Sequence, residues 1–288
     1  MTLELNTPTL DELGSVVTEL ARWQSDDAPL QLHPGDIGWF GRFGMARTAA
    51  AVRTWSTDGQ IVAIGLLDGA DLLRMTLAPQ ADRDRALAEA IVADIVDPAR
   101  GVLPPGAAIV EAPTGTVIKE VLTGAGWADD EPWTPLRRDL TGPVEDPGLR
   151  IETVGPDQAS DWADIVRSAF GSTTFTDQRW YAMSSGVDHE NARSLLGYDD
   201  RGDAVAAITV WSAGPGRPGL IEPMGVHTDH RGQGYGRAIT VAAARTLRDL
   251  GSSSAEVCTE SARAGAVATY RSAGFVADPE RTDRRRTA

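Results

Sequence analysis

The sequence EPMGVHTDHRGQGYGR, residues 222–237, contains three glycines in alternate positions, 232, 234 and 236. Strand-like apolar residues end at Val226, and helical periodicity begins after Gly234. Glycines at such a junction let backbone N–H groups approach an anion, and the helix that follows adds the positive end of its dipole. The segment therefore predicts a phosphate-binding loop between a strand and a helix, flanked by Arg231 and Arg237, which can pair with further phosphate charge.

Three kinds of glycine loop were compared with this segment. A P-loop ends in Gly-Lys-Ser/Thr, whereas Gly236 is followed by Arg237 and Ala238. A dinucleotide-binding loop needs a third glycine at the sixth position, where this chain has Arg237 or Ile239. The remaining pattern, Arg/Gln-x-x-Gly-x-Gly/Ala, fits the six residues RGQGYG at 231–236.

That pattern is the pyrophosphate-binding motif of the GNAT superfamily of acyltransferases, and the second half of the chain resembles this family. The family's Tyr-x-x-x-Gly-Phe ending is matched by residues 270–275, YRSAGF, and the resemblance covers most of residues 150–280. It implies acetyl-CoA as co-substrate and no metal. The residues that it implies for binding acetyl-CoA are Met224, Val226, Arg231, Gly232, Gln233, Gly234, Tyr235, Gly236 and Arg237.

The resemblance also implies catalytic roles. Tyr270 occupies the position of the general acid of many members, and an unperturbed tyrosine pKa of about 10 keeps the hydroxyl protonated. The N–H of Val226 is the candidate donor to the thioester oxygen. Glu222 is the candidate base, on the same strand face as Met224 if the strand is regular, although Pro223 makes that regularity doubtful. A structural or substrate-orienting role for Glu222 remains an equal alternative.

Three other side chains in this half were considered as catalytic groups. His227 and His230 adjoin the loop, and we expect them to face solvent or the co-substrate rather than to act as bases. Cys258 permits a covalent acyl-cysteine route, but a buried structural thiol is the preferred interpretation.

The two halves of the chain repeat the same order of elements. Hairpins are predicted at 53–66 and 196–211, and strands at 72–77 and 220–226. The distance from Val226 to Phe275 is 49 positions, and that from Leu77 to Trp127 is 50. We therefore predict an α/β (α+β) fold of two tandem GNAT-like domains, 1–144 and 145–288, joined by a linker at 140–149. Each domain is expected to be a mixed, mostly antiparallel sheet flanked by helices.

The first half lacks the glycines of the loop. Asp82, Arg85 and Leu87 stand where the second half has Arg231, Gly234 and Gly236, so we expect a degenerate domain that is structural or part of the acceptor cleft. The tandem arrangement is similar to that of the mycothiol synthases, an actinobacterial branch of the family. The chain departs from that branch at Arg263, where an asparagine is usual.

Composition narrows the functional classes. The chain has 288 residues, 42% hydrophobic, and a formal net charge of −14, which disfavours nucleic-acid and anionic membrane partners. No apolar run approaches the roughly 20 residues of a membrane span. The N-terminus has no secretory signal pattern and Cys258 is the single cysteine, so a cytoplasmic location is expected. The RRR at 284–286 is interpreted as a solvated tail.

These observations predict an N-acyltransferase that moves an acetyl group from acetyl-CoA to an amine by direct attack in a ternary complex. The acceptor is expected to be a small primary amine, and the oligomeric state is left open. Alternatives are a non-catalytic acyl-CoA sensor, a protein acetyltransferase acting on lysines or N-termini, and a structural relic that binds no co-substrate.

Overall fold

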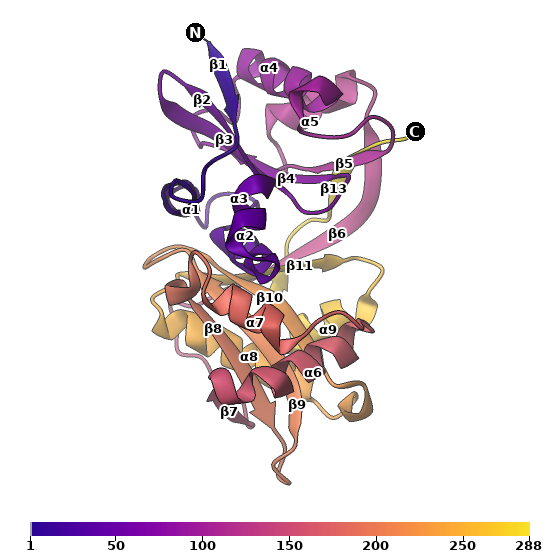
Figure 1. The fold of residues 1–288 in the computed structure, drawn as a ribbon. Helices are drawn as coiled ribbons and strands as arrows, with labels where there is room; N and C mark the ends of the chain where they lie inside the picture. The colour runs from indigo at the N-terminus through magenta and orange to yellow at the C-terminus, as the bar shows by residue number, and fades with distance from the viewer. Residues whose placement is uncertain (1) are drawn as a thin grey trace.

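A computed structural model describes residues 2–288 and arranges them around one continuous sheet (Figure 1). The strands follow the order β1-β2-β3-β4-β5-β13-β6-β11-β10-β9-β8-β7, and β12 pairs with β6. Neighbouring strands are antiparallel except for β4 with β5 and β10 with β11. The mixed, mostly antiparallel sheet flanked by helices that the sequence predicts is thus confirmed.

The first half of the chain supplies one end of the sheet and its covering helices. Its strands are β1 (Leu3–Asn6), β2 (Val52–Thr57), β3 (Gln60–Leu67), β4 (Leu72–Leu77), β5 (Ala108–Glu111) and β6 (Ala128–Asp139). Its helices are α1 (Leu13–Arg22), α2 (Pro34–Phe40), α3 (Met45–Ala51), α4 (Arg85–Val96) and α5 (Val117–Gly124).

The second half repeats this order. Its strands are β7 (Arg150–Thr153), β8 (Ala192–Tyr198), β9 (Ala204–Ser212), β10 (Gly219–Val226), β11 (Ser254–Glu260), β12 (Val276–Ala277) and β13 (Arg281–Arg286). Its helices are α6 (Ala159–Phe170), α7 (Asp177–Ser184), α8 (Tyr235–Asp249) and α9 (Ala264–Ser272).

The halves exchange strands where they meet. The long strand β6 of the first half pairs along β11 of the second, from Trp133 opposite Glu260 to Asp139 opposite Ser254. The C-terminal strand β13 crosses in the other direction and lies between β5 and β6, and Figure 1 shows it in the upper half beside β5. The expectation of a solvated tail at 284–286 was therefore wrong, because these arginines form ladder pairs with residues 108–110.

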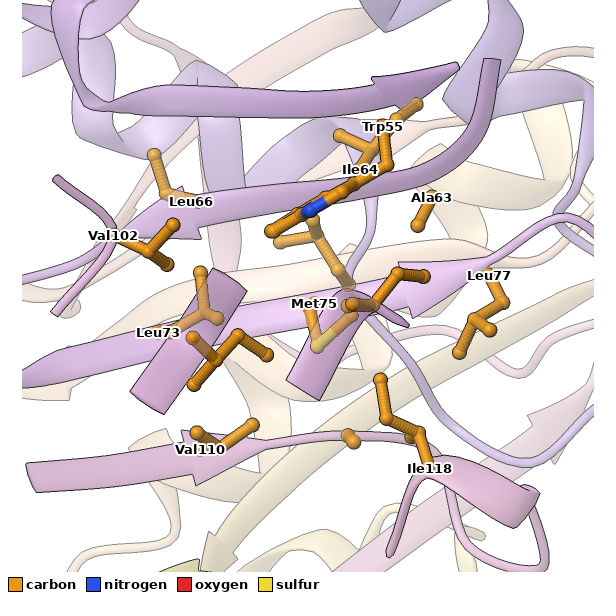
Figure 2. Close-up of a cluster of buried hydrophobic side chains, with 14 of the residues drawn as sticks. Trp55, Ala63, Ile64, Leu66, Leu73, Met75, Leu77, Val102, Val110 and Ile118 are labelled. Carbon is orange, nitrogen blue, oxygen red and sulfur yellow. The ribbon is translucent and has the colours of Figure 1, made fainter. Parts of the chain in front are cut away.

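Strand β4 shows how the alternation of side chains divides core from cleft. Leu73, Met75 and Leu77 point into the core of the first half, which Figure 2 shows together with Trp55 of β2. Because successive side chains of a strand face opposite sides, Arg74 points away from that core. It lines the cavity between the two halves.

Helix α2 of the first half packs directly on strands β9 and β10 of the second. Gly35 and Gly38 lie against the Trp211 ring, where an added Cβ would come within 2.5 Å and 2.3 Å of ring or side-chain carbons. His33 fixes the start of the helix, since its Nδ1 accepts from the Gly35 N–H at 2.9 Å, and its Nε2 lies 3.2 Å from the Pro218 carbonyl. This close contact brings the first half to the site described below.

None of the helices within residues 2–288 combines the length and the apolar character needed to cross a membrane.

Candidate active site

A cavity of about 630 Å³ opens between the two halves. Its walls come from α2 and β4 of the first half and from α6, β10, β11 and α9 of the second. Among the residues that the sequence singles out, Glu222, Met224, Tyr270, Cys258 and Arg263 line it.

Strands β10 and β11 separate along one side of this cavity. Their parallel pairing is limited to Gly219 opposite Ala255 and Leu220 opposite Glu256. The His227 N–H bonds to the Val205 carbonyl at the β9 side, so the alternation of the strand turns the Val226 N–H to the opposite edge, towards the gap. The open edge of β10 thus offers backbone groups that β11 does not take.

The register of β10 against β9 shifts between Ile221 and Met224, as the proline suggests it should. The alternation nevertheless survives, because Glu222, Met224 and Val226 are all partly exposed while the residues between them are buried. The bulge therefore leaves Glu222 and Met224 on the cavity wall.

The glycine loop leads into α8 with a row of free donors. Across residues 2–288, no hydrogen-bond acceptor is found for the six backbone N–H groups from Gly232 to Arg237; the first paired N–H is that of Ala238, which bonds to the Gly234 carbonyl at 3.1 Å. Gly232 and Gly234 have φ of +78° and +85°, values that suit glycine. At Gly236 a Cβ would lie 3.0 Å from Thr269. Consecutive free N–H groups at a helix start fit a phosphate group.

The arginines beside the loop already have protein partners. Arg231 donates to the Ala169 carbonyl at 2.9 Å, and Arg237 donates to the Ser272 carbonyl at 2.9 Å and pairs with Glu145 at 3.3 Å. Both are exposed at the loop, so the remaining N–H groups of each guanidinium can still face an anion.

Tyr270 comes from α9 and is 6% exposed. Its hydroxyl has no hydrogen-bond partner within the described part of the chain, and the side chain lines the cavity. Burial, and then the negative charge of Glu222, raise the pKa of this phenol above its usual value. A phenol held neutral with a free O–H can donate a proton to a group placed in the cavity.

Glu222 lies in a group of charged side chains from the first half. Its carboxyl group shares a hydrogen bond with that of Asp36, which requires one of the two to hold a proton, and Arg74 is 3.9 Å away. Burial raises the pKa of Glu222 well above its ordinary value; Arg74 opposes this shift and Asp36 adds to it. The Glu222 carbonyl is held by the Trp211 indole N–H at 2.7 Å.

Arg74 is the centre of this group. It pairs with Asp36 at 2.9 Å, Glu111 at 2.9 Å and Asp68 at 3.5 Å. Against the effect of burial, Arg281 of β13 and Arg74 lower the pKa of Glu111 to about 2. One strand from each end of the chain therefore meets at the cavity floor.

Sequence reasoning missed Asp36, Arg74 and Glu111. A signal was present, since Arg74 interrupts the apolar strand LLRMTL at 72–77, where a charge needs a buried partner. The partners themselves lie far apart in the sequence and come together only through the packing of α2 and β5.

Cys258 and the loop histidines lie as follows. Burial raises the pKa of the Cys258 thiol to about 11, so at neutral pH it is not the thiolate that a nucleophile requires. His227 caps a short 3-10 turn through an Asp229 N–H at 3.3 Å, and neither it nor His230 lines the cavity. No group of three or more His, Cys, Asp or Glu side chains suited to a metal ion is present in residues 2–288.

Comparisons with known proteins were made for the whole chain. A family model described as acetyltransferase (GNAT) family matches residues 158–275. The mycothiol acetyltransferase of Thermobispora bispora is 30% identical over 157 residues, which are 49% of this chain and 52% of that protein, so the chain matches about half the length of this curated relative.

Solved structures resemble the complete fold. A tandem GNAT protein from the clavulanic acid biosynthesis pathway has a TM-score of 0.63 at 18% identity, over 99% of this chain and 98% of its own. An acetyltransferase of the GNAT family from Colwellia psychrerythraea has a TM-score of 0.64 at 14% identity, over 100% of both chains. The chain belongs to the GNAT superfamily and has its tandem arrangement, with two GNAT-like halves in one polypeptide.

Proposed function

We propose that this protein is an N-acetyltransferase that moves the acetyl group of acetyl-CoA to the amine of a small molecule. Proteins of the GNAT family use acetyl-CoA as co-substrate. The proposed halves are residues 1–144 and 145–288; the second carries the chemistry, and the first closes the acceptor side of the cavity. The observation that carries the proposal is the row of free N–H groups from Gly232 to Arg237, beside a split strand pair and a cavity with Glu222 and Tyr270.

The proposed binding follows from these positions. The free N–H groups of the loop, including those of Gln233 and Tyr235, receive the pyrophosphate of the co-substrate, assisted by the dipole of α8. Backbone groups of Met224 and Val226 on the open edge of β10 hold the pantetheine arm. The Val226 N–H donates to the thioester oxygen, where negative charge develops during attack.

The proposed proton transfers use the two titratable groups that line the cavity. Glu222 accepts a proton from the acceptor's ammonium, directly or through one water, so that a neutral amine attacks. Its raised pKa brings a carboxylate closer to the basicity that this step needs. Tyr270 donates its proton to the departing thiolate, and its free O–H supports that role.

The proposal is tested by measuring release of the CoA thiol with a panel of amines. The panel includes amino acids, amino alcohols, a lysine peptide and, because of the matched relative, the deacetylated form of mycothiol. We expect turnover with free amines. Tyr270→Phe should lower kcat by about 10²- to 10⁴-fold without changing the dissociation constant of acetyl-CoA.

Tyr181→Phe is the matched control, because the Tyr181 hydroxyl bonds to the Pro156 carbonyl outside the cavity and its loss should leave kcat unchanged. Binding of acetyl-CoA without turnover of any amine would instead indicate a sensor. Acetylation of the peptide alone would indicate a protein acetyltransferase, and absence of acetyl-CoA binding by the folded protein would indicate a relic.

A further inference from the structure

The mouth of the cavity contains two arginines that come from different halves. Arg42 lies in the 3-10 turn Gly41–Phe43 that follows α2, and Arg179 lies in α7. The turn and α7 pack against each other, and both arginines line the cavity that contains Glu222 and Tyr270.

Aromatic rings hold the two guanidinium groups in place. Arg42 lies 4.1 Å from the centroid of the Trp39 ring and 4.3 Å from that of Phe43. Arg179 lies 5.1 Å from the Phe43 centroid and 5.9 Å from that of Phe175. Stacking on ring faces orients a guanidinium but leaves its in-plane N–H donors available.

These donors are largely unused. Within residues 2–288 neither arginine forms an ion pair, and Arg42 makes one polar contact, from Nη1 to the Trp39 carbonyl at 2.7 Å. Arg179 makes ring contacts only. Burial lowers the pKa of Arg42 to about 10, although the charges of Asp68 and Glu222 act against this shift. A partly buried, unpaired cation is costly, and an anion bound between the two arginines would offset that cost.

The opposite sign of charge lies nearby. Glu222 and Asp68 are close enough to Arg42 for their charges to act on it, and Asp36 contacts Glu222. An ammonium group suits those carboxylates, and an anionic group suits the arginines. A molecule with both groups a few bonds apart would satisfy each side of the cavity at once.

We propose that Arg42 and Arg179 form an anion-binding subsite, so that the acceptor is a small amine carrying a carboxylate or phosphate near the amino group. This inference rests on the proposed acetyltransferase function and specifies its substrate class. Neither arginine takes part in the proton transfers proposed above; they position the acceptor so that its amine reaches Glu222.

The test compares acceptors that differ only in the anion. Amino acids are paired with their methyl esters, and 2-aminoethyl phosphate is paired with ethanolamine, and kcat/KM is measured for each with saturating acetyl-CoA. We expect at least one anionic member to exceed its neutral partner by roughly 10-fold or more. The carboxylate and phosphate pairs separate the two possible anions.

Arg179→Gln removes one fork while losing only ring contacts. It should lower kcat/KM for the preferred anionic acceptor by roughly 10- to 100-fold, mainly through KM, and leave the neutral partner nearly unchanged. Arg42→Gln should act in the same way. Arg47→Gln is the matched control, because Arg47 lies 4.6 Å from the same Phe43 ring but is exposed and does not line the cavity.

Acetyl-CoA affinity and the melting temperature of each variant are measured in parallel, and both should stay at the wild-type value for Arg179→Gln. If the wild type acetylates neutral and anionic partners equally, or Arg179→Gln weakens both equally, the subsite is disproved while the acetyltransferase function stands. If the wild type acetylates no member of any pair although acetyl-CoA binds, the proposed function fails and the subsite fails with it.

Discussion

The two strand–loop–helix units of this protein, β4 to α4 and β10 to α8, occupy equivalent places in the two halves and differ where chemistry would occur. The equivalence extends to the helix that closes each half. The Trp127 N–H bonds to the Leu122 carbonyl at 3.1 Å, and the Phe275 N–H bonds to the Tyr270 carbonyl at 3.1 Å. A buried leucine thus stands where the second half has the phenol.

The helix starts differ in a second way. At α4 the carboxylate of Asp84 accepts from the Leu87 N–H at 3.0 Å, so the helix is capped by its own chain. At α8 the cap position is Gly234, which has no side chain, and the N–H groups remain free. The same element binds an anion or closes itself according to the residue at one position.

The first unit has not lost all connection with the cavity. Strand β4 supplies Arg74, which pairs with Asp36 and Glu111 of its own half and approaches Glu222 of the other. A half that cannot hold a phosphate at α4 still shapes the charge around the candidate base of its partner.

The largest expected effect concerns Arg74. Arg74→Met leaves Asp36 and Glu111 buried without their shared cation, which should lower the free energy of unfolding by about 3–5 kcal/mol at neutral pH. Buried carboxylates without a cation have raised pKa values, so the loss should become smaller as the pH falls and they take up protons. Urea unfolding at pH 8 and pH 5 measures both effects.

Arg85→Met is the control for that experiment, since the Arg85–Glu120 pair is exposed and its removal should cost at most about 1 kcal/mol. A loss for Arg74→Met no greater than for this control would show that β4 contributes little to the junction.

A second experiment turns one helix start into the other. Gly234→Asp gives α8 the kind of residue that caps α4, and it should weaken acetyl-CoA binding by roughly 100-fold, because the carboxylate repels phosphate and occupies the N–H groups. Gly234→Asn is the matched neutral variant, and it tolerates the same positive φ. Calorimetry should show a clearly smaller loss for Asn; equal losses would mean that backbone conformation, rather than charge, decides binding.

The reverse substitution should have a smaller effect. Asp84→Ala removes the α4 cap and should lower the free energy of unfolding by about 1 kcal/mol. It should not create a second acetyl-CoA site, because Arg85 and Leu87 stand where the second half has glycines. Chemical unfolding measures the first result and binding stoichiometry the second. A stoichiometry of two would show that the cap alone had closed the first half.

The sequence predicted the part of this comparison that is local. Residues 231–236 and 270–275 are contiguous patterns, and they identified the loop, the helix after it and the family. The pairing of β6 with β11 and of β13 with β5 was not predictable in this way, because the halves are similar enough that either could supply the closing strand. The contact of Asp36 with Glu222 depends in turn on two glycines of α2 that admit the Trp211 ring.

The finest test of the coupling between halves is the pH dependence of acetyl transfer. The negative charge of Asp36 raises the pKa of Glu222, and that of Asp68 does so more weakly. If Glu222 is the base, Asp36→Asn should move the acidic limb of the kcat/KM profile to lower pH, because Glu222 then ionises more readily. Asp68→Asn should move the limb in the same direction by a smaller amount. One acceptor is used throughout, so that the titration of its own amine contributes equally to each profile. An acidic limb at the same pH in all three proteins would remove Glu222 as the base and leave the first half a purely structural part of the cleft.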